Sequence, residues 1–194
     1  MKNTMKLLTF KTLLCALVLG LFAGCAATRP IADRVKETLF AILADRVLDA
    51  RALDLYAGSG AVGIEALSRG AASCAFVEHD RRAVSAIREN LDRAGVAERA
   101  SVHAVDVLRY LGGSVGDRFD LAFVDPPYVE RAILAPLERL VPRLAPEAVV
   151  VVKHHWRTTI PEPHGLSRWR ERRFGETSLT FLAASDEADG VEEP

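Results

Sequence analysis

The chain has 194 residues, of which 49% are hydrophobic and 26% charged, a composition that excludes a disordered or collagen-like protein. Its formal net charge of −1 neither requires nor excludes a nucleic-acid partner. The three cysteines are an odd set without paired spacing, so the sequence implies neither a disulfide framework nor a zinc site.

Residues 1–27 have the pattern of a bacterial export signal. Three lysines precede the apolar run 13–23, as a basic region precedes the apolar region of a secretory signal. The run is shorter than the span of about 20 residues that a transmembrane helix needs. It ends in Phe-Ala-Gly-Cys, which resembles the lipobox of bacterial lipoproteins and predicts lipid attachment at Cys25. The alternative is a buried helix or strand at the start of the domain.

Residues 28–184 alternate helical and strand-like patterns, and we expect them to form one domain. Helical periodicity predicts a first helix over 31–43. Short apolar runs predict strands over 52–56, 74–78, 101–105, 119–124 and 148–153. The segments between them predict helices over 61–69, 80–94 and 131–144. Strands that alternate with helices indicate a parallel sheet with both faces covered.

The end of the domain has a different pattern. The segments 167–174 and 177–183 flank Gly175 and Glu176, which is typical of a β-hairpin. We therefore expect an antiparallel addition to the sheet. Residues 185–194 contain five acids, no base and few apolar side chains, and we expect them to form a disordered tail.

A glycine-rich loop follows the first predicted strand. Gly58, Gly60 and Gly63 satisfy the spacing G-x-G-x-x-G, which by itself also fits a dinucleotide site. Asp54, four residues earlier, argues against a dinucleotide because a carboxylate there would repel a pyrophosphate. A carboxylate instead suits a ligand with an ammonium group, which S-adenosylmethionine has and NAD lacks.

Acidic residues also follow the second and third predicted strands. Glu78 is placed to accept hydrogen bonds from ribose hydroxyls, and Asp106 to face the adenine amino group. The carboxyl ends of parallel strands share the sheet edge at which α/β proteins bind ligands. Each acid alone could instead cap a helix. Together they predict a cofactor site, which we assign to Asp54, Tyr56, Gly58, Ser59, Gly60, Glu78 and Asp106.

The fourth predicted strand ends in Asp125, Pro126, Pro127 and Tyr128, which we assign as catalytic. Two successive prolines fix the backbone and remove two donors, leaving a stiff row of acceptors. Asp125 and the Pro126 carbonyl could accept both N–H groups of an exocyclic amine and turn its lone pair toward the methyl group. Tyr128 offers a face for base stacking, and the base must be single-stranded or flipped out. The alternative is a simple Pro-Pro turn.

The segments that carry these motifs resemble one protein family. They are 28–40, 53–72, 76–84, 119–128 and 172–181, and they are similar to the bacterial 16S rRNA guanine-N2-methyltransferases of the RsmD type. The resemblance implies a Rossmann-like α/β fold with a seven-stranded, mostly parallel sheet, and S-adenosylmethionine as cofactor with no metal. It also implies 16S rRNA or the assembling small subunit as partner. The assignment of guanine N2 as the methylated atom rests on the resemblance alone, because the motif suits adenine N6 of DNA or RNA as well.

Several arginines are candidates for contacts with RNA. By the resemblance, Arg29 and Arg34 contact RNA or help to close the site, although the basic hairpin that usually precedes them is replaced here. Arg170, Arg172 and Arg173 lie in the predicted hairpin, where arginines mixed with aromatic residues suit phosphate contacts and stacking. The alternative is that these charges protect a sheet edge.

The two parts of the chain predict different locations. The enzymatic domain predicts a cytoplasmic monomer, whereas Cys25 predicts attachment to a membrane. A second hypothesis is therefore an exported, lipid-anchored protein that reuses the fold without catalysis.

Overall fold

The computed structural model describes residues 33–114, 116, 118–127 and 133–185. The export-signal, Arg29 and Tyr128 predictions and all but the first residue of the predicted acidic tail lie outside these residues. The elements in chain order are α2 (Asp33–Leu43), η1 (Ala44–Val47), β1 (Arg51–Leu55), α3 (Ala61–Ser68), β2 (Ser73–Glu78), α4 (Arg81–Ala94), η2 (Ala97–Arg99), β3 (Ala100–Ala104), α5 (Val107–Leu111), β4 (Phe119–Val124), α6 (Leu134–Leu140), η4 (Val141–Arg143), β5 (Leu144–His155), β6 (Leu166–Phe174) and β7 (Thr177–Ala184).

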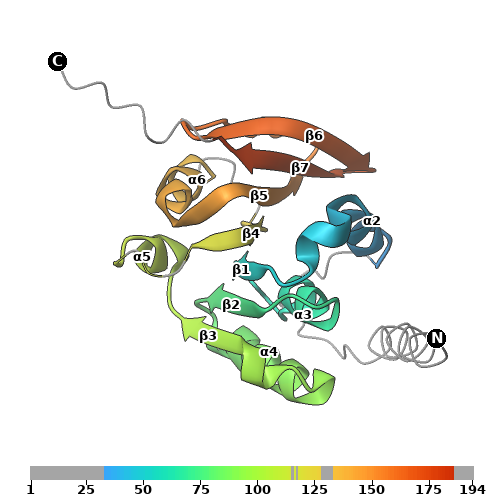
Figure 1. Ribbon diagram of the computed structural model, residues 1–194, viewed down its shortest axis with the longest axis vertical. Helices are drawn as coiled ribbons and strands as arrows, with labels where there is room; N and C mark the ends of the chain where they lie inside the picture. Colours follow the sequence, from blue (N-terminus) through green and yellow to red (C-terminus); the bar gives the residue numbers. More distant parts are fainter. Residues whose placement is uncertain (1–32, 115, 117, 128–132, 186–194) are drawn as a thin grey trace, which may run out of the picture.

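The strands form one seven-stranded sheet in the order β3-β2-β1-β4-β5-β7-β6 (Figure 1). Strands β1 to β5 pair in parallel, and β7 and β6 add to β5 as an antiparallel hairpin. The predicted fold class is thus confirmed. The strand order reverses between β1 and β4, and open α/β sheets bind ligands at such a switch point, outside the carboxyl ends of the strands.

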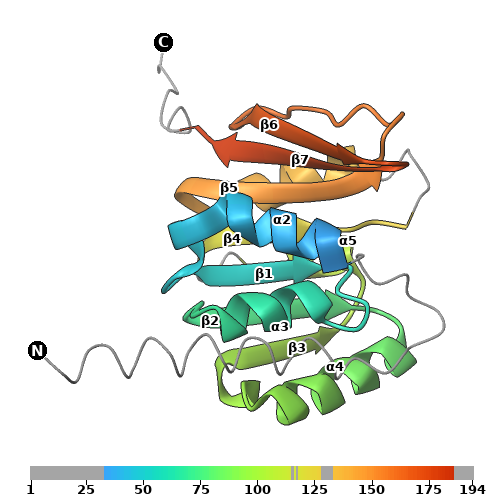
Figure 2. The ribbon, with the colours of Figure 1, turned by 90° about the vertical axis from the view of Figure 1, so that its right-hand side faces the viewer.

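Helices cover both faces of the sheet. Helices α2, α3 and α4 lie on the face toward the viewer in Figure 2, and α5 and α6 lie on the other face, as Figure 1 shows. Because successive strand residues point to opposite faces, each strand supplies both core layers. Phe76, Phe123 and Val151 pack with α2 and α3, whereas Leu55 and Val152 pack with α5 and α6.

A buried ion pair holds α2 against α3. Lys36 Nζ lies 3.6 Å from Glu65 Oε2, and both side chains are almost fully buried. Arg69 Nε donates to the other oxygen of Glu65 at 2.7 Å, and its guanidinium lies 4.8 Å from the centre of the Phe40 ring. These contacts fix α2 over the core beside the strands that carry the predicted site.

The structure contains one helix that was not predicted and shortens another. Helix α5 was not predicted, since it has only five residues and too few for a periodic pattern. The predicted helix 131–144 is shorter, because α6 ends at Leu140 and a 3₁₀ turn containing Pro142 leads into β5 at Leu144. None of the helices in the described ranges combines the length and apolar character needed to span a bilayer.

Candidate active site

The glycine loop between β1 and α3 depends on backbone that only glycine adopts easily. Gly58 and Gly60 have φ values of 56° and 78°, in the left-handed region. Gly63 is needed for close packing, because a Cβ there would lie 2.4 Å from the Phe76 ring and 2.7 Å from Cys74 Sγ. The side chain of Asn90 on α4 adds support by donating to the Ser59 carbonyl at 3.0 Å.

Asp54 lies buried beneath this loop at the end of β1. Its Oδ2 accepts a hydrogen bond from the Gly63 N–H at 2.9 Å, so the carboxyl group connects β1 to the first turn of α3. Burial raises the pKa of Asp54 to about 8, partly opposed by the Gly63 hydrogen bond and reinforced by the charges of Asp125 and Glu78. A cation placed beside Asp54 would favour its ionised form.

Glu78 connects the end of β2 to the same loop. One oxygen of its buried carboxylate accepts from the Gly58 N–H at 3.0 Å. The other accepts from the N–H groups of His79 and Asp80 at 2.8 and 2.9 Å. Each carboxylate oxygen has about two acceptor positions, so Oε2 retains capacity for a further donor such as a ribose hydroxyl.

Asp106 and Tyr56 lie near each other at this edge of the sheet. Asp106 is exposed, and its Oδ1 accepts from the N–H groups of Leu108 and Arg109, which makes it the N-cap of α5. Burial raises the pKa of the Tyr56 hydroxyl, and the charge of Asp106 raises it further. Tyr56 also has a φ of 59°, an uncommon backbone value for a residue with a side chain.

Asp125 follows β4 and forms an ion pair that the sequence did not predict. Lys153 Nζ donates to Asp125 Oδ2 at 2.6 Å. Burial raises the pKa of Asp125, and the charge and hydrogen bond of Lys153 oppose that rise. Pro126 is buried and Pro127 exposed. The signal that could have revealed this pair is the β4–β5 register, which aligns Val124 with Val152, one residue before each partner.

The acids converge because strand alternation and parallel pairing place them together. Asp54 lies in β1 and Asp125 follows the neighbouring strand β4, and the charges of Asp125 and Glu78 both act on Asp54. No group of His, Cys, Asp and Glu suited to a metal ion occurs among the residues with described positions. A separate cavity of about 670 Å³ lies at the opposite, amino-terminal edge, between Arg51 and Arg143. It is remote from these acids and belongs to a different surface.

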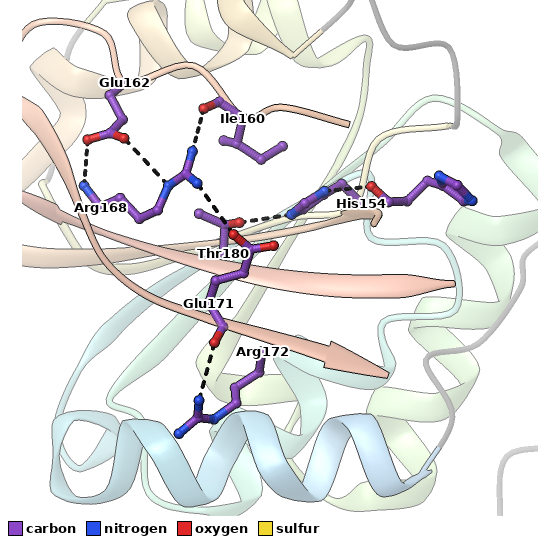
Figure 3. A network of polar contacts seen from close by, with 8 residues as sticks. His154, Ile160, Glu162, Arg168, Glu171, Arg172 and Thr180 are labelled. Carbon is purple, nitrogen blue, oxygen red and sulfur yellow. Dashed lines mark hydrogen bonds and ion pairs between the residues drawn. The ribbon is translucent and has the colours of Figure 1, made fainter. Parts of the chain in front are cut away.

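The structure separates the hairpin arginines into two groups. Arg168 pairs with Glu162 and Glu171 and donates to the Ile160 carbonyl, so its charge is balanced within the hairpin (Figure 3). For Arg170, Arg172 and Arg173 no carboxylate partner is found within the described ranges.

A tryptophan at the end of β5 holds two arginines. The Trp156 ring lies 3.8 Å from the Arg173 guanidinium and 4.6 Å from that of Arg157. Both arginines are exposed, and Trp156 follows Lys153 by three residues. Arg34, the remaining candidate, is exposed on α2. The sequence indicated the mixture of arginine and aromatic residues, but not which arginines lacked an acidic partner.

Comparisons with known proteins agree with this geometry. The family model described as "Conserved hypothetical protein 95" matches residues 18–183. Ribosomal RNA small subunit methyltransferase D of Escherichia coli K12 is 37% identical over 156 residues, covering 77% of this chain and 76% of that protein. The protein of the same name from Haemophilus influenzae is 33% identical over 153 residues, covering 76% and 78%. The solved structure of yhhF from Escherichia coli is 33% identical, with a TM-score of 0.75, covering 82% and 90%.

Proposed function

The chain belongs to the conserved hypothetical protein 95 family, and on this premise we propose that it methylates the N2 amine of a guanine in 16S rRNA. It is an S-adenosylmethionine-dependent rRNA methyltransferase, and the resemblance stated from the sequence motifs is confirmed. The observation that supports the proposal most strongly is the meeting of the glycine loop after β1 with Asp125 after β4, at the switch point of the sheet.

The residues around the glycine loop fit S-adenosylmethionine, which supplies an electrophilic methyl group. Gly58 and Gly60 bring bare backbone to the ligand surface, and Asp54 offers a carboxyl group to an ammonium. Glu78 keeps acceptor capacity for the ribose. Asp106, whose charge acts on the neighbouring Tyr56, is the proposed partner of the adenine amino group. Three acids near one edge of the sheet favour a ligand of positive charge.

Asp125 and the Pro126 carbonyl orient the target amine. Both are acceptors, and an exocyclic amine has two N–H donors, so the pair can hold the nitrogen with its lone pair directed away from the base ring. The nitrogen is otherwise a poor nucleophile because that lone pair is delocalised into the ring. Catalysis then comes from positioning and electrostatics rather than from a covalent enzyme intermediate. Tyr128 stays a prediction as the stacking residue.

The arginines on α2, on β6 and after β5 support contact with RNA phosphates. We assign this role to Arg34, Arg170, Arg172 and Arg173 as proposed from the sequence, and add Arg157, which shares Trp156 with Arg173. Guanidinium groups stacked on an aromatic ring are held in place and keep their outer N–H groups for phosphate oxygens. Arg168 is left out because two glutamates neutralise it.

Identification of the methylated nucleoside tests this function. The protein is incubated with labelled S-adenosylmethionine and either free small-subunit RNA or partly assembled subunits, and the RNA is digested to nucleosides. The proposal predicts N2-methylguanosine. Label in N6-methyladenosine, from RNA or from a DNA control, would show that the target is adenine N6 and not guanine N2.

The exported, lipid-anchored alternative is tested separately on cells. Because rRNA methylation requires access to assembling ribosomes, we propose that the working enzyme is the cytosolic form, acting as a monomer. Fractionation together with the mass of the mature N-terminus distinguishes the two locations. A mature chain that begins with a lipidated Cys25 would contradict the cytosolic proposal.

A further inference from the structure

Lys153 and Asp125 are brought together by the sheet. Strands β4 and β5 are parallel and pair Val124 with Val152, so the next residue of each strand is Asp125 or Lys153. Phe123 and the aligned Val151 pack in the core layer under α2 and α3. By strand alternation, Asp125 and Lys153 therefore extend from this same face, which also carries Asp54.

In the ion pair of Lys153 and Asp125, the lysine side chain is the more deeply buried of the two. The Lys153 side chain is 9% exposed and that of Asp125 is 33% exposed, with 2.6 Å between Nζ and Oδ2. Burying an ammonium group costs free energy unless it is paired. The partner that satisfies it in the described part of the chain is the carboxylate of the methyltransferase motif.

The other two acids at this edge are stabilised differently. Asp54 accepts from the Gly63 backbone, and Glu78 accepts from the backbone N–H groups that follow it and from Gly58. Glu78 also has His79 Nδ1 at 3.3 Å, a contact that is ionic only when that histidine is protonated. Asp125 therefore differs from both in having a buried lysine as its partner.

We propose that Lys153 is a positioning residue for methyl transfer, holding Oδ2 of Asp125 so that the carboxylate stays ionised and presents Oδ1 to the target amine. The inference rests on the proposed function, because the amine is its substrate. A protonated carboxyl group would donate a hydrogen bond where the amine needs an acceptor. Lys153 opposes that protonation in a setting where burial favours it.

The reaction releases a proton from the amine, and an ionised Asp125 can accept it. The amine nitrogen gives its lone pair to the methyl carbon while the carbon–sulfur bond breaks and sulfur keeps that electron pair. The nitrogen must then lose one proton, which passes to Asp125 or to water. An ionised Asp125 is able both to orient the amine with its charge and to accept this proton, whereas a protonated one has lost the charge and cannot accept the proton.

The test compares Lys153→Met and Lys153→Arg with the wild-type protein. The rate constant kcat is measured from about pH 6 to about pH 9 with both substrates saturating, which covers carboxyl pKa values raised by about 2–5 units from the ordinary value of about 3.9. Without the lysine charge, the acid limb of the profile should move to higher pH. At pH values below the pKa of both proteins this lowers kcat about tenfold for a shift of one unit, and kcat recovers toward alkaline pH. Lys153→Arg should restore most of the profile.

Lys36→Met is the matched control, since Lys36 is likewise a buried, ion-paired lysine but holds α2 to α3. It should lower the melting temperature and leave the shape of the pH profile unchanged. The affinity for S-adenosylmethionine is measured for every variant, because Asp54 also lies near and titrates near pH 8. Lys153→Met should bind the cofactor as the wild type does.

Two results would overturn the inference. One is an unchanged profile in Lys153→Met, and the other is a loss of kcat by the same factor at every pH, which indicates a structural role only. If the wild type methylates no RNA, the proposed function fails instead. An NMR titration of the ¹³C-labelled Asp125 carboxyl group needs no substrate and then decides whether Lys153 keeps it ionised.

Discussion

The two aspartates of the site, Asp54 and Asp125, lie in different environments. Asp54 is buried and held by a backbone N–H, and it has no cationic partner among the described residues, whereas Asp125 has Lys153 at 2.6 Å. Burial raises the pKa of both, and only Asp125 has a lysine that opposes the rise. We therefore expect Asp54 to be largely neutral near neutral pH without ligand, and Asp125 to be the more readily ionised group.

The raised pKa of Asp54 predicts a pH-dependent stability. Between the unfolded pKa of 3.8 and the folded pKa of about 8, the folded state holds a proton that the unfolded state releases. Its contribution to stability is complete below the unfolded value and is lost as the pH rises through about 8. Asp54→Asn removes this loss while keeping an acceptor for Gly63.

The measurement is the free energy of unfolding of both proteins by urea, without cofactor, across this pH range. The advantage of Asp54→Asn should grow by about 1 kcal/mol or more between about pH 5 and pH 8. It should then level off. A difference that stays constant with pH would contradict the raised pKa.

A further prediction concerns the close packing around Gly63. A methyl group there would overlap the Phe76 ring and Cys74 Sγ, which belong to the buried β2 strand and have little room to move. Gly63→Ala should therefore reduce the free energy of unfolding by about 1–3 kcal/mol. Gly113→Ala is the control, because its nearest atom would be 3.4 Å away. Equal effects of the two substitutions would contradict the packing argument.

At the scale of elements, the β6–β7 hairpin extends the sheet and carries charge beside the site. Strand β7 lies between β5 and β6, so it is an internal strand and β6 forms the edge. Figure 3 shows Arg168 and Glu162 on one side of the hairpin and Arg172 toward α2. The hairpin thereby places its unneutralised arginines near the end of β5 that carries Lys153 and Trp156.

The two arginine groups predict different effects on RNA binding. The double substitution Arg157→Ala and Arg173→Ala should weaken binding to small-subunit RNA and reduce the slope of log K against log salt by about 1–2, since each phosphate contact contributes about 0.7–0.9. Arg168→Ala should leave the slope unchanged, because its charge is neutralised by Glu162 and Glu171. Salt-dependent titrations with fluorescent RNA give the slopes. An equal fall of the slope in both variants would contradict the distinction between carboxylate-paired and unpaired arginines.

At the scale of the whole molecule, much of the fold follows from the sequence. Apolar strands alternating with helices predicted the parallel sheet, and Gly175 with Glu176 predicted the hairpin. Helix α5 was missed, because five residues are stabilised by the Asp106 cap and by packing rather than by a periodic pattern. The end of α6 was misplaced because the turn at Pro142 depends on where β5 joins the sheet.

The sequence predicted the site residues that belong to local motifs. It did not predict the contacts that depend on how the strands and helices pack. The positions of Asp54, Glu78 and Asp125 at strand ends follow from local pattern. The Lys153 contact depends on the β4–β5 register, and the Asn90 contact depends on how α4 packs against the glycine loop. Such contacts join residues distant in sequence, so no local pattern contains them.

The most direct measurement is methyl transfer from labelled S-adenosylmethionine to small-subunit RNA by the wild-type protein and by Asp125→Ala. We expect label at guanine N2 with the wild type. We expect a loss of at least about 100-fold in kcat for Asp125→Ala, with cofactor affinity largely retained, because that side chain orients the amine rather than the cofactor. Full activity of Asp125→Ala, or a wild type that labels no small-subunit RNA, would contradict these expectations.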